Sequence, residues 1–145
     1  MTKECKIMGK AKESELEEKV HANFRGETSE VGQYLAMAKQ AQRQGYPEIA
    51  EVLKTIAWEE AEHAARFAEL NDLICGDIRE NLQMMLNGEL NAQKGKADAV
   101  EEAQELNKQD AAIVFTETSR DEGRHAAMLR GLISRFFPGE QCCEQ

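Results

Sequence analysis

The tetrapeptides Glu60-Ala61-Glu62-His63 and Glu122-Gly123-Arg124-His125 decide the fold of this sequence, because each is an E-x-x-H motif. On an α-helix, residues three positions apart lie on one face, so the Glu and the His of each motif project together. The two motifs are 62 residues apart, and the same spacing separates Glu27 from Glu89, each of which follows a glycine. The sequence therefore predicts two similar helical hairpins, each with one Glu followed by an E-x-x-H motif.

This pattern predicts a carboxylate-rich site for two metal ions. In helical bundles with such sites, two helices each supply one Glu and the other two each supply Glu-x-x-His. A lone E-x-x-H is common by chance, but two in register with two further core acids are specific. The predicted metal ligands are Glu27, Glu60, His63, Glu89, Glu122 and His125. The alternative is a metal-free bundle with polar core residues, and it would leave costly carboxylates unpaired in the core.

Four helices are predicted, with apolar residues at alternating steps of four and three, as in a left-handed bundle. Ser14 is the expected cap of the first helix, with Glu17 reaching back to it. Gly45 is its expected end, and Pro47 suits the first turn of the second helix. The predicted helices span about 15–44, 47–76, 77–106 and 108–137.

Length and composition favour a single all-α domain, since the 145 residues include only 2 prolines and 6% aromatic residues. We expect an N-terminal extension over 1–13, a helical di-metal domain over 14–137 and a tail over 138–145. The domain divides into hairpins 14–76 and 77–137. A net charge of -9 disfavours nucleic acid and anionic membranes as partners, and no stretch approaches the ~20 apolar residues of a membrane span.

The cysteines do not form a recognisable metal or redox motif. Cys5, Cys75, Cys142 and Cys143 show no C-x-x-C spacing, which argues against a zinc ribbon or a rubredoxin-type iron site. Adjacent Cys142 and Cys143 are either a reduced tail end or a redox or metal-handing tail. With no apolar segment of signal-peptide length, a reducing cytoplasm is the expected location.

Three residues near the predicted ligands need separate interpretation. Glu30 lies one helical turn after Glu27 and is replaced by Ala92 in the second hairpin, so it is either a seventh ligand or a solvated carboxylate. Tyr34 lies two turns after Glu27 and either packs in the core or hydrogen-bonds a ligand carboxylate. Lys96 is the one charged misfit among the otherwise apolar or ligand positions of the third helix.

These residues resemble the rubrerythrin family within the ferritin-like superfamily. The resemblance covers about 16–137 and is most specific in the first hairpin, in Gly26-Glu27-Thr28-Ser29-Glu30, Gly45-Tyr46-Pro47-Glu48-Ile49-Ala50 and Glu60-Ala61-Glu62-His63. It implies a ferritin-like four-helix bundle holding two iron ions. In that bundle Glu60 and Glu122 would bridge the metals, Glu27 and Glu89 would be terminal ligands, and His63 and His125 would each bind one metal.

The resemblance also implies a role for Glu30 of the first hairpin. Glu30 looks like the family's extra glutamate, which trades places with a histidine as iron changes oxidation state. If the family's pairing of helices carries over, the iron next to Glu30 is the one held by Glu89. The displaced histidine would then be His125. Glu30, by this resemblance, and Tyr34, by its position two turns after Glu27, are the candidate catalytic residues.

The family activity implied is reduction of hydrogen peroxide to water in defence against oxidative stress, with two ferrous ions supplying the electrons. The sequence lacks the rubredoxin-like module with two C-x-x-C pairs, so a separate rubredoxin or flavoprotein is the expected electron donor. Alternatives are a ferroxidase or iron-storage protein, a dimanganese catalase, and a non-catalytic bundle stabilised by metal. Manganese or zinc could replace iron, because carboxylate and imidazole ligands do not select among these metals.

The short connection between the second and third helices predicts a domain-swapped homodimer. Ferritin-like bundles need these two helices to run parallel, which takes a long crossover. Bringing Glu89 level with His63 within one chain would require a climb of about 36 Å, whereas the residues around Gly76 span only ~10 Å when extended. The first hairpin of one chain would then pair with the second hairpin of another; the alternatives are a simple up-down bundle or early fraying of the second helix.

Overall fold

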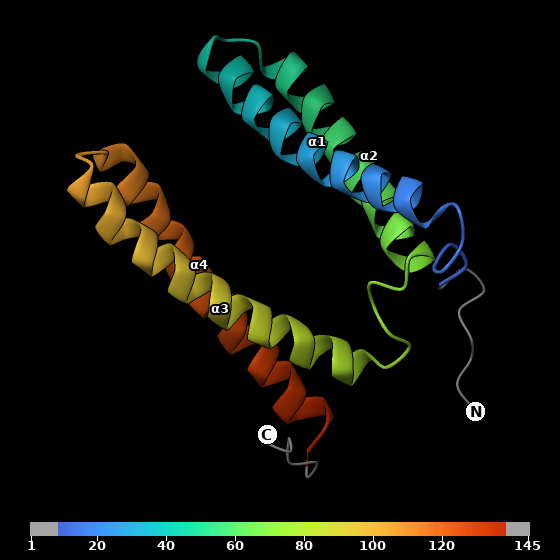
Figure 1. Ribbon diagram of the computed structural model, residues 1–145. Helices are drawn as coiled ribbons and strands as arrows, with labels where there is room; N and C mark the ends of the chain where they lie inside the picture. Colours follow the sequence, from blue (N-terminus) through green and yellow to red (C-terminus); the bar gives the residue numbers. More distant parts are fainter. Residues whose placement is uncertain (1–8, 139–145) are drawn as a thin grey trace. The chain divides into compact units, whose positions relative to one another are not determined.

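The computed structural model describes residues 9–138 and consists of four α-helices arranged as two hairpins (Figure 1). The helices are α1 (Glu17–Arg43), α2 (Pro47–Leu70), α3 (Ile78–Glu105) and α4 (Gln109–Phe136). α1 packs on α2 and α3 packs on α4. No strand occurs within residues 9–138, so the predicted all-α class is confirmed, in agreement with a ferritin-like four-helix bundle. The chain divides into two compact units between Gly76 and Asp77, and each hairpin is described by itself.

The second helix is shorter than predicted, because it ends at Leu70 and not at Gly76. The segment before α1 supplies the hydrogen bonds that end it: the Gly9 and Ala11 N–H groups donate to the carbonyls of Glu69 and Leu70 at 2.8 and 2.9 Å. The carbonyls at the end of a helix have no partner within the helix. These two bonds satisfy that need from outside, and the chain then turns through Asp72 at φ 54°.

The first helix begins two residues later than predicted, at Glu17. The Ser14 hydroxyl donates to the Ala11 carbonyl at 2.5 Å, so it belongs to the preceding turn and does not cap the helix. The Glu17 carboxylate does reach back, but it accepts from the Glu13 N–H at 2.6 Å. The hydrogen bond from Ala11 to the end of α2 fixes the position of this turn. The prediction that Ser14 caps the first helix is therefore wrong.

The other helix ends follow the sequence closely. Gly45 has φ +84°, the left-handed conformation that a C-terminal glycine provides, and Pro47 opens α2. Asp77 caps α3 by accepting from the Arg79 and Glu80 N–H groups. The interior glycines of α3 do not interrupt it.

Alanine dominates the buried core of each hairpin. In the first, Ala38, Ala41 and Ala50 form a buried cluster against the partly buried Leu53. In the second, the buried apolar residues are Leu86, Ala103, Ala112 and Ala126. Small side chains let two helices approach closely but remove little apolar surface from water. Larger apolar side chains such as Trp58, 69% exposed, remain accessible. None of the helices within residues 9–138 has the length and hydropathy needed to cross a membrane.

Candidate metal centre

The first hairpin brings three of the predicted ligands together. Glu27 comes from α1, and Glu60 and His63 come from one face of α2; one ligand atom from each lies within 4.8 Å of the others. The Nδ1 atom of His63 is 2.9 Å from Oε2 of Glu60 and 3.6 Å from Oε2 of Glu27. The E-x-x-H spacing on α2 accounts for the first distance, because positions i and i+3 are neighbours on a helix.

The second hairpin repeats this arrangement with nearly the same distances. Glu89 of α3 and Glu122 and His125 of α4 form a group of the same kind, again within 4.8 Å. The Nδ1 atom of His125 is 3.1 Å from Oε2 of Glu122 and 3.5 Å from Oε2 of Glu89. The 62-residue sequence repeat is therefore also a repeat of geometry, since equivalent residues occupy equivalent places in each hairpin.

The carboxylates of both groups are largely shielded from water. The side chains of Glu27, Glu60, Glu89 and Glu122 are between 15% and 20% exposed, whereas the two histidines are 45% and 48% exposed. Placing two carboxylates side by side and partly out of water is unfavourable unless a proton or a cation neutralises them. Each group therefore has the character of a cation site.

The two carboxylates of the first group shift each other's pKa in opposite directions. A hydrogen bond with Glu60, followed by burial and the negative charge of Glu60, raises the pKa of Glu27. The same hydrogen bond, together with the one to His63, lowers the pKa of Glu60. In the metal-free protein, Glu27 therefore holds its proton to a higher pH than an isolated glutamate, and Glu60 loses its proton at a lower pH.

Replacing Glu27 with glutamine should raise the melting temperature of the metal-free protein at neutral pH by a few degrees. Because the pKa of Glu27 is raised in the folded state, its stabilising contribution is present below the ordinary value of 4.5 and is lost as pH rises through the raised pKa. Glutamine removes that loss, so the gain over wild type should shrink as the pH falls toward 4.5. The pKa of Glu60 is lowered, so ionised Glu60 stabilises the fold at neutral pH. That contribution is lost only as the pH falls through the lowered pKa.

Thermal denaturation followed by circular dichroism in a chelator, at several pH values, measures this difference. Exposed Glu62 on α2 provides the matched control, because Glu62→Gln removes one negative charge outside the group. An equal gain from Glu62→Gln would contradict the assignment to Glu27.

The donor atoms of both groups fit the metals that the sequence predicts. Carboxylate oxygen and imidazole nitrogen are the ligands of iron, manganese and zinc in helical bundles, and three protein donors per group leave coordination positions open. Glu27, Glu60 and His63 could hold one ion, and Glu89, Glu122 and His125 could hold another.

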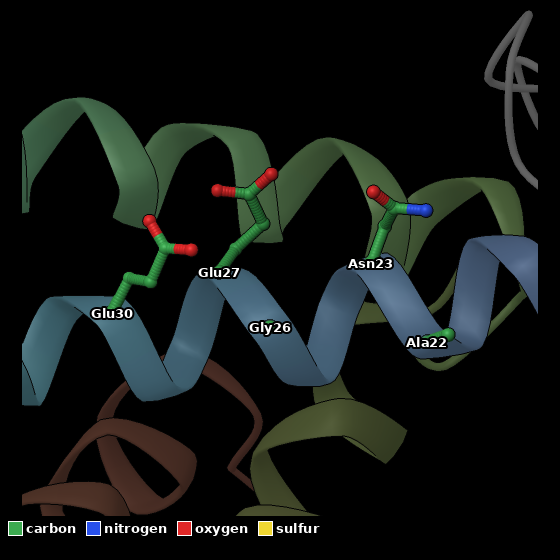
Figure 2. Close-up of a pocket in the computed structure, with 5 residues that line it drawn as sticks. All are labelled: Ala22, Asn23, Gly26, Glu27 and Glu30. Carbon is green, nitrogen blue, oxygen red and sulfur yellow. The ribbon is translucent and has the colours of Figure 1, made fainter.

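Glu30 lies beside the first group but is not part of it. It lines a surface hollow of about 260 Å³ with Ala22, Asn23, Gly26 and Glu27. Figure 2 shows the Glu27 and Glu30 carboxylates projecting from the same side of α1. The charge of Glu30 also contributes to the raised pKa of Glu27. Glu30 is exposed, so its predicted role as a seventh ligand would require its side chain to move toward the metal.

The remaining predicted residues occupy different positions. Tyr34 is half-buried on α1, and within residues 9–138 no hydrogen bond of its hydroxyl is present. Lys96, the charged residue among the apolar and ligand positions of the third helix, forms an ion pair with Oε1 of Glu122. Cys75 is half-buried just before the boundary between the units. Cys5, Cys142 and Cys143 lie outside the described residues.

Two helical hairpins with matching carboxylate–imidazole groups define a ferritin-like protein of the carboxylate-rich metal-binding class. The rubrerythrin family model matches residues 18–133. The sequence is 56% identical over 130 residues to the uncharacterized protein MJ0746 of Methanocaldococcus jannaschii, covering 90% of this chain and 92% of that protein. It is 46% identical over 131 residues to reverse rubrerythrin-1 of Clostridium acetobutylicum, covering 90% and 72%. The chain belongs to the rubrerythrin family, and this membership supports a di-iron protein of the oxidoreductase type.

Proposed function

We propose that this protein is a di-iron peroxidase that reduces hydrogen peroxide to water. The observation that supports this most strongly is the repeated Glu plus Glu-x-x-His group, with Glu30 next to the first copy only. A symmetric pair of groups suffices to hold two ions. The additional carboxylate beside one of them favours a site that changes during a reaction over one that only stabilises the fold.

The chemistry balances with two electrons and two protons, which convert one peroxide into two waters. Two ferrous ions, when bound, supply the two electrons. The residues of the chain hold the ions, and Glu30 is the proposed proton carrier to the departing oxygen because it is exposed and adjacent to Glu27. We propose a separate rubredoxin-like protein as the donor that re-reduces the iron.

The deciding experiment loads the metal-free protein anaerobically with two ferrous ions per chain and mixes it separately with peroxide and dioxygen. Rapid stoichiometric oxidation by peroxide, with slow oxidation by dioxygen, is expected. Faster reaction with dioxygen would instead indicate a ferroxidase. Failure to bind two ions would favour a structural bundle or another metal.

Replacing Glu30 with alanine should slow oxidation of the ferrous protein by peroxide about tenfold. A positioned proton donor contributes about 10²-fold or more, and water entering the exposed position can replace part of that effect. Stopped-flow absorbance at saturating iron measures the rate. Glu18→Ala, which removes an exposed carboxylate elsewhere on α1, is the control. An unchanged rate in Glu30→Ala would refute the proton-carrier role.

We also propose that the active form is a domain-swapped homodimer. Because α2 ends early, the connector must span about 27 Å along the helices to bring Glu89 level with His63 within one chain. A fully extended 71–77 connector could just span this distance. The connector is not extended, however: the Asp72 and Leu73 N–H groups bond back to the carbonyls of Glu69 and Ala68 at 3.2 and 3.0 Å. The residues after Leu73 reach only about 17 Å, which supports exchange of hairpins between two chains.

A further inference from the structure

One charged side chain that is not a predicted ligand contacts a predicted ligand directly. Lys96 of α3 forms an ion pair with Oε1 of Glu122 on α4, and the two side chains are 32% and 15% exposed. The other oxygen of that carboxylate, Oε2, faces Nδ1 of His125 at 3.1 Å. The two oxygens of Glu122 are therefore divided between the metal-binding group and a lysine ammonium.

The first hairpin has no such cation at the matching place. The 62-residue repeat aligns Lys96 with Tyr34, and it aligns Glu30 with Ala92. The first hairpin thus has an additional carboxylate next to its group, whereas the second has a positive charge within its group. Two sites that share the same three donor residues therefore differ in charge.

We infer that Lys96 is a resident counterion of Glu122, which weakens metal binding by the second hairpin and makes the two ions bind in order. This inference rests on the proposed two-metal function. A metal ion entering the group of Glu89, Glu122 and His125 either displaces the ammonium or remains next to its positive charge. Both cost free energy, because like charges a few ångströms apart repel in a partly shielded site.

Lys96 also controls how Glu122 can bind. Lys96 pairs with Oε1 of Glu122, the oxygen that does not face His125. Glu122 can therefore donate one oxygen while the ammonium is in place and both only after it leaves. The order that follows is binding by Glu27, Glu60 and His63 first, then release of Glu122 and binding by the second group.

Anaerobic titration of the metal-free full chain with cobalt(II), followed by visible absorbance, tests this order. Wild type should bind two equivalents in two distinguishable steps. His125→Ala should remove the weaker step and His63→Ala the tighter one, which assigns each step to a hairpin. Lys96→Met should strengthen the weaker step about tenfold and leave the tighter step unchanged.

Two controls separate the local ion pair from net charge. Lys96→Arg keeps the positive charge and should retain the two-step titration of wild type. Lys94→Met removes a positive charge from an exposed position on the same helix and should also titrate like wild type. The reciprocal variant Tyr34→Lys should weaken the tighter step.

The inference is overturned if Lys96→Met leaves the second step unchanged, or if Lys94→Met strengthens it equally. It is also overturned if wild type binds both equivalents with one affinity, or binds no cobalt at all. The peroxidase proposal is tested separately by the reaction of the ferrous protein with peroxide. Ordered cobalt binding without peroxide turnover would refute that function and leave the role of Lys96 intact.

Discussion

Replacing Glu60 with glutamine is expected to lower the rate of peroxide reduction more than about 100-fold while leaving the helical content unchanged. Loss of a residue that merely supports a metal ligand costs about 10–100-fold, and Glu60 is placed to be a ligand itself. Its carboxylate lies 2.9 Å from His63 and hydrogen-bonds Glu27. Glutamine keeps the size of the side chain and removes the negative charge that attracts the ion.

The matched control is Glu59→Gln, because Glu59 is the preceding residue on α2 and is exposed. Peroxide-driven oxidation of the ferrous protein and bound iron per chain are measured on both variants, with circular dichroism to confirm the fold. Loss of turnover in Glu60→Gln alone supports the enzyme. Loss of dimer assembly without a change in turnover per assembled protein would favour a structural role for the metals.

The parts of the site that the sequence predicts are those fixed by helical periodicity. Once Glu60 and His63 are on a helix, the spacing of three residues brings them to one face, and the partner helix adds Glu27. The same argument applied 62 residues later places the second group. Neither step depends on how the two hairpins are joined, which is why local spacing was sufficient.

The features that the sequence did not reveal depend on contacts between residues far apart in the chain. The end of α2 is set by Gly9 and Ala11, about 60 residues earlier, so the apolar pattern that continues toward Gly76 gave no sign of it. From the sequence, Lys96 is recognisable only as a charged residue among the apolar and ligand positions of the third helix. Its ion pair with Glu122 requires the register between α3 and α4, and periodicity along a single helix does not contain that register.

Mixing two inactive variants is expected to restore about a quarter of wild-type activity if the dimer exchanges its hairpins. Glu60→Gln damages the first hairpin and Glu122→Gln damages the second. In a swapped heterodimer, one site combines the two damaged hairpins and the other combines the two intact hairpins. Random assortment makes about half of the dimers mixed, and each mixed dimer has one intact site of two.

The variants are unfolded together in denaturant, refolded without metal and then loaded with ferrous iron before the peroxide assay. Each variant refolded alone gives the background. A mixture of Glu60→Gln with Glu27→Gln is the matched control, because both changes lie in the first hairpin and no pairing yields an intact site. Recovery only in the first mixture would establish that each site uses ligands from two chains.

Absence of recovery would contradict the exchange, provided that light scattering shows the refolded proteins to be assembled. Each site would then draw both hairpins from one chain. That closure would require the turn at Asp72 and Leu73 to give up its bonds to the end of α2 so that the connector could extend. The complementation assay therefore tests the assembly and the local turn together, because the conformation of seven connecting residues decides which chain completes the site.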